Sequence, residues 1–84
     1  MKVTVKRKDA PVPKPLEIYT EFIKLEASLK LANEVESGGM AKAVIQDGLV
    51  AVNGQVCTMR GKKLYAGDTV SFRGRSFVIV SHEA

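Results

Sequence analysis

The 84-residue sequence contains no tryptophan, a single cysteine and a single histidine, and it has no long run of apolar residues. A lone cysteine cannot form a disulfide within the chain, and a membrane-spanning helix needs about 20 consecutive apolar residues. The basic start, residues 1–8, also lacks the apolar stretch of a secretory signal. We therefore expect no internal disulfide, no membrane association and a cytoplasmic location.

The chemical groups of an enzyme active site are also scarce. Catalysis needs a nucleophile beside a base, a set of metal ligands or paired acids in a pocket. His82 stands alone near the C-terminus, Cys57 lies in an apolar segment where an inert thiol is expected, and Asp68 lies in a turn where local hydrogen bonds are expected. No spacing is typical of a zinc site. We expect a protein that catalyses no reaction and needs no cofactor or metal.

Basic residues outnumber acidic ones, 13 to 9, which gives a formal net charge of +4 and a pI of about 9.4. The excess is uneven, because residues 1–15 carry +4, residues 16–36 carry −3 and residues 37–84 carry +3. Such an excess favours an anionic partner such as nucleic acid, although a solvated basic face gives the same composition.

The chain length allows one domain. Residues 1–15 combine five basic residues with three prolines, a composition that opposes helix formation and favours an extended, flexible arm. Residues 16–84 are expected to form the single folded domain. Lys6, Arg7 and Lys8 of the arm could add affinity for an anionic partner, or the arm could remain a solvated tail.

Hydrophobic periodicity predicts a strand followed by two helices. Apolar and polar residues alternate over residues 16–23, which is typical of a strand with one buried face. From Lys24 the spacing becomes helical as far as Val35 and predicts about three turns. Ser37 is a suitable N-cap for a second helix that ends before Gly48.

The rest of the chain predicts β-structure. Asn53-Gly54 between two apolar alternations is the strongest short-range signal for a two-residue hairpin. A basic segment, residues 59–64, follows, and residues 69–72 and 77–81 are predicted strands on either side of residues 73–76. The predicted fold class is α+β, with two short helices packed on one face of a small mixed or antiparallel sheet and an additional N-terminal strand.

Four short segments, in this order and spacing, resemble the S4 RNA-binding domain family. Lys24-Leu25-Glu26-Ala27-Ser28-Leu29 resembles the family's Arg-Leu-Asp-x-x-Leu opening, and Ser37-Gly38-Gly39-Met40-Ala41-Lys42 resembles the start of its second helix. Val52-Asn53-Gly54 and Gly67-Asp68-x-Val70 resemble its strand, its turn and its final Gly-Asp. The similarity covers about residues 22–72 and is greatest to the short, free-standing YaaA-like S4 proteins of Firmicutes.

This resemblance implies an S4-like (αL) fold and binding to structured RNA, foremost rRNA during ribosome assembly or maturation in bacteria. Lys24 matches the family's leading Arg. Gly38 stands where many members have an RNA-contacting Arg, and Met40 stands where Gln is common. Any contact with RNA at residue 38 must therefore come from the backbone.

The start of the second helix is a suitable phosphate site in its own right, because Ser37-Gly38-Gly39 places backbone N–H groups at the positive end of a helix dipole. The alternative interpretation is a tight turn between the helices that binds no ligand, which explains the same two glycines. The basic segment between strands carries cations that are better fixed than those of the arm. The candidate RNA-binding residues are Lys24, Lys30, Ser37, Gly38, Gly39, Lys42, Arg60, Lys62 and Lys63.

Aromatic residues are few, and they show no paired, exposed platform of the kind that single-strand binders use to stack bases. The phenylalanines, Phe22 among them, have core spacing, whereas Tyr65 beside the basic segment could stack on a base. Structured RNA has a deep major groove that side chains cannot read, so recognition through backbone position and shape suits it.

Two other functions fit the sequence. A protein-interaction module on the ribosome could use the acidic first helix and the edge of the C-terminal strand. A factor acting on stalled large subunits near tRNA lies within the same family, but such chains usually begin at the first helix motif and lack Ser-Gly-Gly. We expect a monomer in each case.

Overall fold

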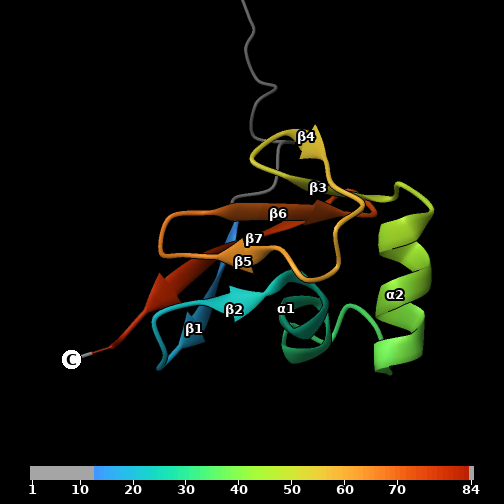
Figure 1. Ribbon diagram of the computed structural model, residues 1–84. Helices are drawn as coiled ribbons and strands as arrows, with labels where there is room; N and C mark the ends of the chain where they lie inside the picture. The colour runs from blue at the N-terminus through green and yellow to red at the C-terminus, as the bar shows by residue number, and fades with distance from the viewer. Residues whose placement is uncertain (1–12, 84) are drawn as a thin grey trace, which may run out of the picture.

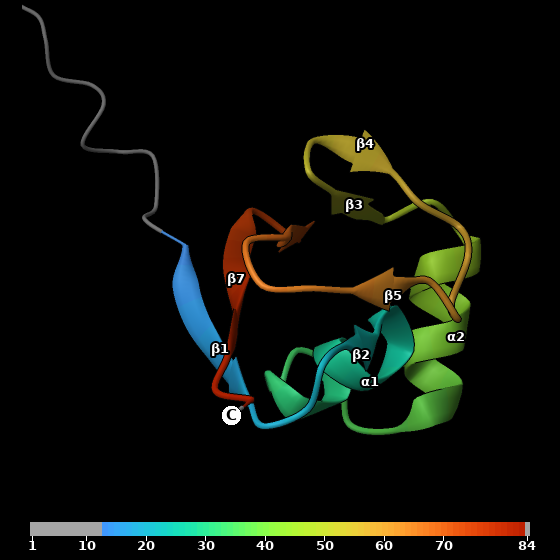
Figure 2. The ribbon, with the colours of Figure 1, turned by 60° about the vertical axis from the view of Figure 1, so that its left-hand side comes forward.

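The computed structural model describes residues 13–83 (Figures 1 and 2), so most of the expected arm, residues 1–12, lies outside the described residues. No helix within residues 13–83 is long and apolar enough to cross a membrane. The elements, in chain order, are β1 (Lys14–Ile18), β2 (Ile23–Lys24), α1 (Leu25–Leu31), α2 (Gly38–Gln46), β3 (Val50–Val52), β4 (Gln55–Val56), β5 (Lys63–Leu64), β6 (Thr69–Phe72) and β7 (Arg75–Ser81).

The strands form two separate sheets. The larger sheet has the order β1-β7-β6-β3-β4, in which β1 and β7 are parallel and the other neighbours are antiparallel. β2 and β5 form an antiparallel ladder of their own. The predicted α+β class with a mixed sheet is confirmed. The C-terminal strand β7 lies inside the sheet, so the prediction that it offers a free edge is wrong.

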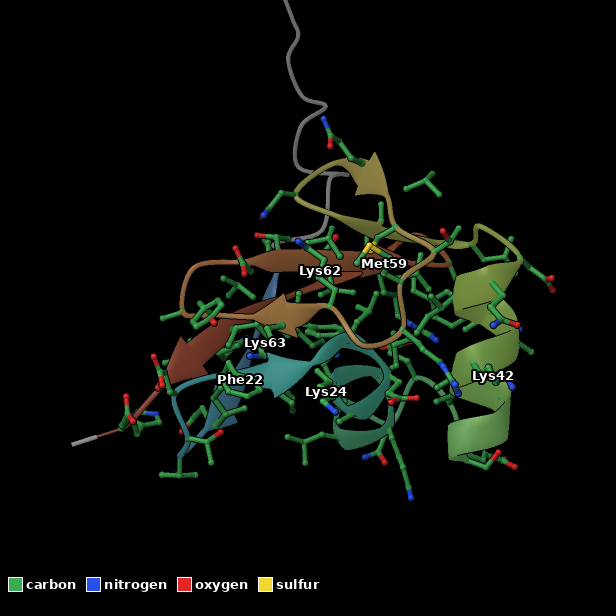
Figure 3. The ribbon with its side chains drawn as sticks, viewed as in Figure 1. Phe22, Lys24, Lys42, Met59, Lys62 and Lys63 are labelled. Atoms are coloured by element: carbon green, nitrogen blue, oxygen red, sulfur yellow. The ribbon has the colours of Figure 1, made fainter. Side chains whose placement is uncertain are left out.

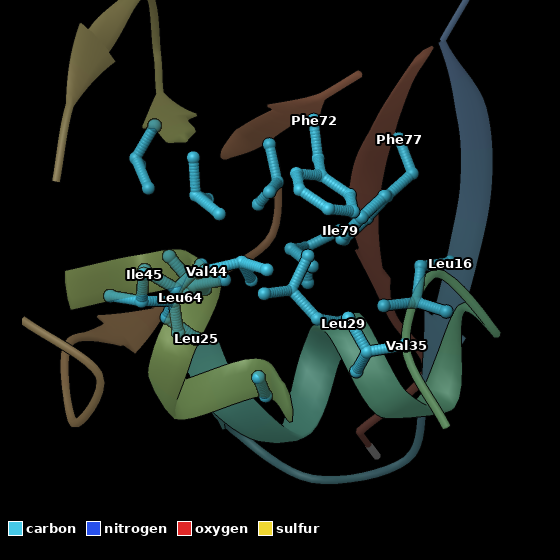
Figure 4. Close-up of a cluster of buried hydrophobic side chains, with 14 of the residues drawn as sticks. Leu16, Leu25, Leu29, Val35, Val44, Ile45, Leu64, Phe72, Phe77 and Ile79 are labelled. Carbon is cyan, nitrogen blue, oxygen red and sulfur yellow. The ribbon is translucent and has the colours of Figure 1, made fainter. Parts of the chain in front are cut away.

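Both helices pack on one face of the larger sheet, where alternate strand residues point inward (Figure 4). The inward side chains of the strands include Phe72, Phe77 and Ile79, which confirms the core position predicted for two of the phenylalanines. Leu29 of α1 and Ile45 of α2 pack against them and are fully buried. Apolar burial of this kind is the main favourable term in folding.

The strand predicted over residues 16–23 has the wrong extent, because the structure divides this segment in two. β1 begins at Lys14, inside the expected arm, and runs beside β7 until Ile18 lies opposite Ser81. β7 ends there, and the Ser81 hydroxyl donates a hydrogen bond of 2.8 Å to the carbonyl of Thr20. With no partner strand beyond Ser81, the chain bends and forms β2 in the other sheet.

The first helix is shorter than the predicted three turns. α1 ends at Leu31, and Asn33 adopts φ of 61°, the left-handed conformation that Asn tolerates well. The Asn33 N–H donates to the carbonyl of Lys30, and the Glu34 N–H donates to that of Leu29, which is the Schellman pattern that ends a helix. Val35 is buried as the apolar pattern suggested, but it packs from the connection between the helices.

The predicted limits of the second helix are confirmed. The Ser37 side chain caps α2 by accepting a hydrogen bond of 3.2 Å from the N–H of Met40. Gly48 has φ of 77° and follows the last helical residues in the left-handed position where glycine is favoured.

Two hairpins complete the larger sheet. Asn53 and Gly54 both have positive φ, 52° and 85°, which confirms the predicted two-residue turn between β3 and β4. Arg73 and Gly74 repeat this geometry between β6 and β7, with φ of 55° and 76°. β7 therefore begins at Arg75, two residues before the predicted strand start.

Candidate nucleic-acid interface

The ladder of β2 and β5 presents two lysines to solvent. Its two residue pairs are Ile23 opposite Leu64 and Lys24 opposite Lys63. Leu64 is fully buried and Ile23 packs against the core, whereas both lysines are exposed. Like charges directly opposite each other on a sheet are destabilising, so this arrangement favours the presence of an anion.

The basic segment before β5 is held against the first turn of α1. The Leu25 N–H donates to the carbonyl of Lys62 at 2.8 Å, and the Glu26 N–H donates to the carbonyl of Arg60 at 3.1 Å. These bonds satisfy N–H groups that a helix start otherwise leaves without partners. They also fix the backbone that carries Arg60 and Lys62, whose side chains are exposed.

The start of α2 is open to an approaching ligand. Gly38 and Gly39 are exposed, and neither has the positive φ that would require glycine. A Cβ atom at Gly38 would meet no atom within 4 Å, and one at Gly39 would meet only the Ser37 Oγ at 3.9 Å. A sterically tight turn therefore does not explain these glycines, and the positive φ of the connection belongs to Asn33 instead.

Lys42 projects from α2 one turn beyond Gly38, on the same face of the helix. The loop between β4 and β5 passes beside α2 in both ribbon views (Figures 1 and 2). Figure 3 shows Lys24, Lys62 and Lys63 on the ladder and its loop, with Lys42 on the neighbouring helix. The name basic face is used below for this surface, which consists of Lys24, Ser37, Gly38, Gly39, Lys42, Arg60, Lys62 and Lys63.

Lys30 lies apart from the basic segment. It is in the last turn of α1, whereas residues 60–62 contact the first turn. It lines a shallow hollow whose other residues are Ile23, Ala27, Leu31 and Asn33. A cation in the last turn of a helix also interacts favourably with the helix dipole, so Lys30 has a structural role available without RNA.

Within residues 13–83, the cations of the basic face form no salt bridge. The salt bridges within residues 13–83 are Glu34 with Arg75, at 2.8 Å, and Glu17 with His82, at 3.0 Å. Both join other parts of the molecule, and neither includes a residue of the basic face. The acidic residues within residues 13–36 therefore form no salt bridge with this surface.

Two aromatic rings flank the lysine pair. Phe22 is half-buried beside β2, and its ring centroid lies 6.0 Å from that of Tyr65, beside β5. The Nζ of Lys63 lies 4.8 Å from the centroid of the Phe22 ring. The prediction that Phe22 belongs to the core is wrong, because Phe22 is half-buried and lies outside the core cluster.

The S4 domain family model matches residues 16–80, a range that contains both helices and all strands apart from the first two residues of β1 and the last residue of β7. The chain belongs to the S4 domain family. This result agrees with the order of elements described above, and it confirms the resemblance carried by the helix-start and Asn-Gly motifs.

Two relatives of this S4 domain extend the comparison. "Probable ribosome maturation protein RlbA" of Bacillus subtilis is 46% identical over 68 residues, which cover 80% of this chain and 96% of the relative. YbcJ of Escherichia coli is 47% identical over 53 residues, which cover 63% of this chain and 76% of that protein. The solution structure of YbcJ matches with a TM-score of 0.64 and 34% identity, covers 94% of this chain and 99% of its own, and is described as revealing an αL motif involved in RNA binding.

The turn after β5 ties the S4 domain together through side chains, as expected for Asp68. Asp68 accepts hydrogen bonds from the Tyr65 N–H, at 2.8 Å, and from the Asn53 side-chain amide, at 3.2 Å. The Asn53 Oδ1 in turn accepts from the Thr69 N–H at 3.0 Å. The β3–β4 turn and the end of β5 are thereby fixed to each other.

Sequence reasoning missed Phe22 because its position beside Tyr65 depends on a pairing between distant segments. Residues 22–24 and 63–65 are about 40 positions apart, and only their pairing turns Phe22 outward with Lys24.

Among the described residues, no three His, Cys, Asp or Glu side chains are placed to hold a metal ion.

Proposed function

We propose that this S4 domain binds structured RNA without catalysing a reaction, and that its target is rRNA during ribosome maturation. The observation that carries the proposal is the exposed Lys24–Lys63 pair, which lies beside a segment whose backbone is fixed to α1. A fixed group of cations that forms no salt bridge within residues 13–83 is suited to a phosphate backbone of fixed shape.

The relatives support the same function. The Bacillus subtilis relative is named for ribosome maturation, and the solution structure of YbcJ is described in terms of RNA binding. A cytoplasmic location accords with a ribosomal target. A factor acting near tRNA on stalled large subunits remains an alternative within this family.

The basic face offers two kinds of phosphate contact. At the start of α2, backbone N–H groups and Lys42 meet one stretch of RNA backbone, since the two glycines leave the helix end uncovered. On the ladder and its loop, Arg60, Lys62 and the lysine pair meet another stretch. Contacts of this type recognise A-form RNA through shape rather than base sequence. Lys30 is a further proposed contact, at the margin of this surface.

We expect binding to rRNA fragments to weaken steeply with salt, because each neutralised phosphate releases counterions. Four to six contacts give a slope of about −3 to −5 for the logarithm of the association constant against the logarithm of salt concentration. Lys42→Ala combined with Lys63→Ala should weaken binding about tenfold or more and make the slope less negative by about 2. The melting temperature should hardly change, because both side chains are exposed.

Lys14→Ala, alone and combined with Arg75→Ala, is the control for charge lost outside the basic face. Fluorescence anisotropy between 50 and 300 mM salt measures the affinities of all variants. Equal losses in the control and the Lys42/Lys63 variant would assign binding to net charge alone. Crosslinking in cells followed by sequencing of the attached RNA then separates rRNA from tRNA as the target.

The hollow lined by Ile23, Ala27 and Leu31 favours a second candidate function, because it leaves Leu31 exposed on the outer face of α1. A ribosomal protein bound there would make the chain a protein-interaction module. Co-sedimentation with ribosomal particles that persists at high salt, without binding to isolated rRNA, would favour this function over the proposed one.

A further inference from the structure

The outer face of the β2–β5 ladder carries two aromatic rings next to two lysines. Side chains alternate across a strand, so Ile23 and Leu64 point into the core while their neighbours point outward. Continued by one residue, the register that places Lys24 opposite Lys63 also places Phe22 opposite Tyr65. Four side chains therefore share the outer face of the ladder, and Figure 3 labels three of them, Phe22, Lys24 and Lys63.

Burial accounts only in part for the two rings. Leu64 on the opposite face of the ladder is fully buried, whereas Phe22 is half-buried and Tyr65 is 44% exposed. The rings are tilted by 50° with centroids 6.0 Å apart, so they contact each other loosely and do not form a closed stack. An aromatic surface beside cations can contact a nucleotide at two points, because the base stacks on the ring and the phosphate pairs with the cation.

The backbone of Tyr65 is held in place before any ligand binds. Its N–H donates to the carboxylate of Asp68, and its carbonyl accepts a hydrogen bond of 3.0 Å from the Asp68 N–H. The Lys63 Nζ lies over the Phe22 ring, 4.8 Å from its centroid, so this cation stands directly beside the aromatic rings. Such fixing reduces the entropy lost when a nucleotide binds.

We propose that this face of the ladder binds one unpaired nucleotide of the RNA, with its base stacked on Tyr65 and Phe22 and its phosphate neutralised by Lys63 and Lys24. The proposal rests on the RNA binding proposed above and specifies the class of RNA. An uninterrupted duplex keeps its bases stacked on each other and gives the rings no partner. The preferred RNA is therefore a helix interrupted by a bulge or ended by a loop.

Two hairpin RNAs with the same stem test this proposal, one of them containing a single bulged 2-aminopurine nucleotide. The full-length protein should bind the bulged RNA about tenfold more tightly than the paired one, and binding should change the 2-aminopurine fluorescence. Tyr65→Leu should remove this preference and leave affinity for the paired stem within about twofold. Phe22→Leu should reduce the preference in the same way.

Tyr19→Leu is the matched control, because Tyr19 is 72% exposed but stacks on His82, away from the ladder. It should bind both RNAs as the unsubstituted protein does. Thermal unfolding of each variant checks folding, and Tyr65→Leu decides the result if Phe22→Leu unfolds.

Each contrary outcome has a distinct meaning. Equal, salt-dependent affinity of the unsubstituted protein for the two hairpins would overturn the nucleotide site while leaving RNA binding intact. A loss of affinity for both hairpins alike in Tyr65→Leu would also overturn it. Absence of binding to either hairpin and to rRNA fragments at low salt would overturn the proposed function and this inference together.

Discussion

At the scale of single residues, Gly38 and Gly39 stand out because the fold does not require them. Their backbone lies outside the left-handed region, and the space around a Cβ at Gly38 is empty. Glycine within a helix costs up to about 1 kcal/mol relative to alanine, since its unfolded chain is more flexible. Two adjacent glycines at an exposed helix start are therefore better explained by access to the backbone than by packing.

Gly38→Ala separates these explanations. The free energy of unfolding should stay the same or rise by up to about 1 kcal/mol, because the methyl group meets no atom and reduces the flexibility of the unfolded chain. Affinity for rRNA fragments should fall severalfold, because the methyl group hinders a phosphate at the N–H groups. Urea unfolding and fluorescence anisotropy measure the two quantities. Unchanged affinity would remove the start of α2 from the interface.

At the scale of elements, the β2–β5 ladder depends on its surroundings. Each strand has two residues, and a two-stranded ladder is marginally stable by itself in water. Leu64 anchors it in the core, and the bonds from the first turn of α1 to residues 60 and 62 hold its loop. The core and α1 thus hold in place the backbone that carries the lysine pair and the aromatic rings.

Leu64→Ala should reduce the free energy of unfolding by about 2 to 5 kcal/mol, since it removes a fully buried side chain and leaves a cavity beneath the ladder. Val56→Ala, at an exposed position of β4, is the control and should cost less than about 1 kcal/mol. Urea unfolding monitored by circular dichroism measures both. A loss below 1 kcal/mol for Leu64→Ala would show that the ladder does not depend on this anchor.

At the scale of the whole molecule, the charged residues that give the net charge of +4 have two different roles. The Glu34–Arg75 pair joins the connection between the helices to the start of β7, and the Glu17–His82 pair joins β1 to the residue after β7, while the lysines of the basic face form no salt bridge among the described residues. Residues 1–12 add further basic groups whose contribution only a binding experiment can measure.

The triple change of Lys6, Arg7 and Lys8 to Ala measures that contribution. Affinity for rRNA fragments should fall about two- to tenfold, and the salt slope should become less negative by up to about 2 to 3, if these residues contact phosphates. The melting temperature should not change. A variant that exchanges Lys and Arg at the three positions keeps the charge and serves as the control. The same affinity and slope in the triple variant would identify these residues as a solvated tail.

The features that were predicted correctly depend on interactions between residues close together in the sequence. The Ser37 cap, the left-handed Gly48 and the Asn53-Gly54 turn each depend on residues within a few positions of one another, and the structure confirms all three. The extents of the first strand and the first helix were wrong because they depend on other segments. The strand ends where β7 ends, and Val35 reaches the core from outside the helix that its spacing suggested.

The sequence by itself determined the α+β class and most of the elements, because these follow from periodicity, capping and turn chemistry, and its resemblance to the S4 domain indicated the family and most of the cations of the candidate interface. Only the tertiary structure decided that Lys24 and Lys63 stand opposite each other, that Phe22 lies beside Tyr65, and that β1 runs parallel to β7. Each of these contacts joins segments about 40 or more residues apart, and no local preference specifies such a pairing. The physical cause is burial of Leu64 and the inward strand residues in one core, which fixes the side of the ladder that remains exposed.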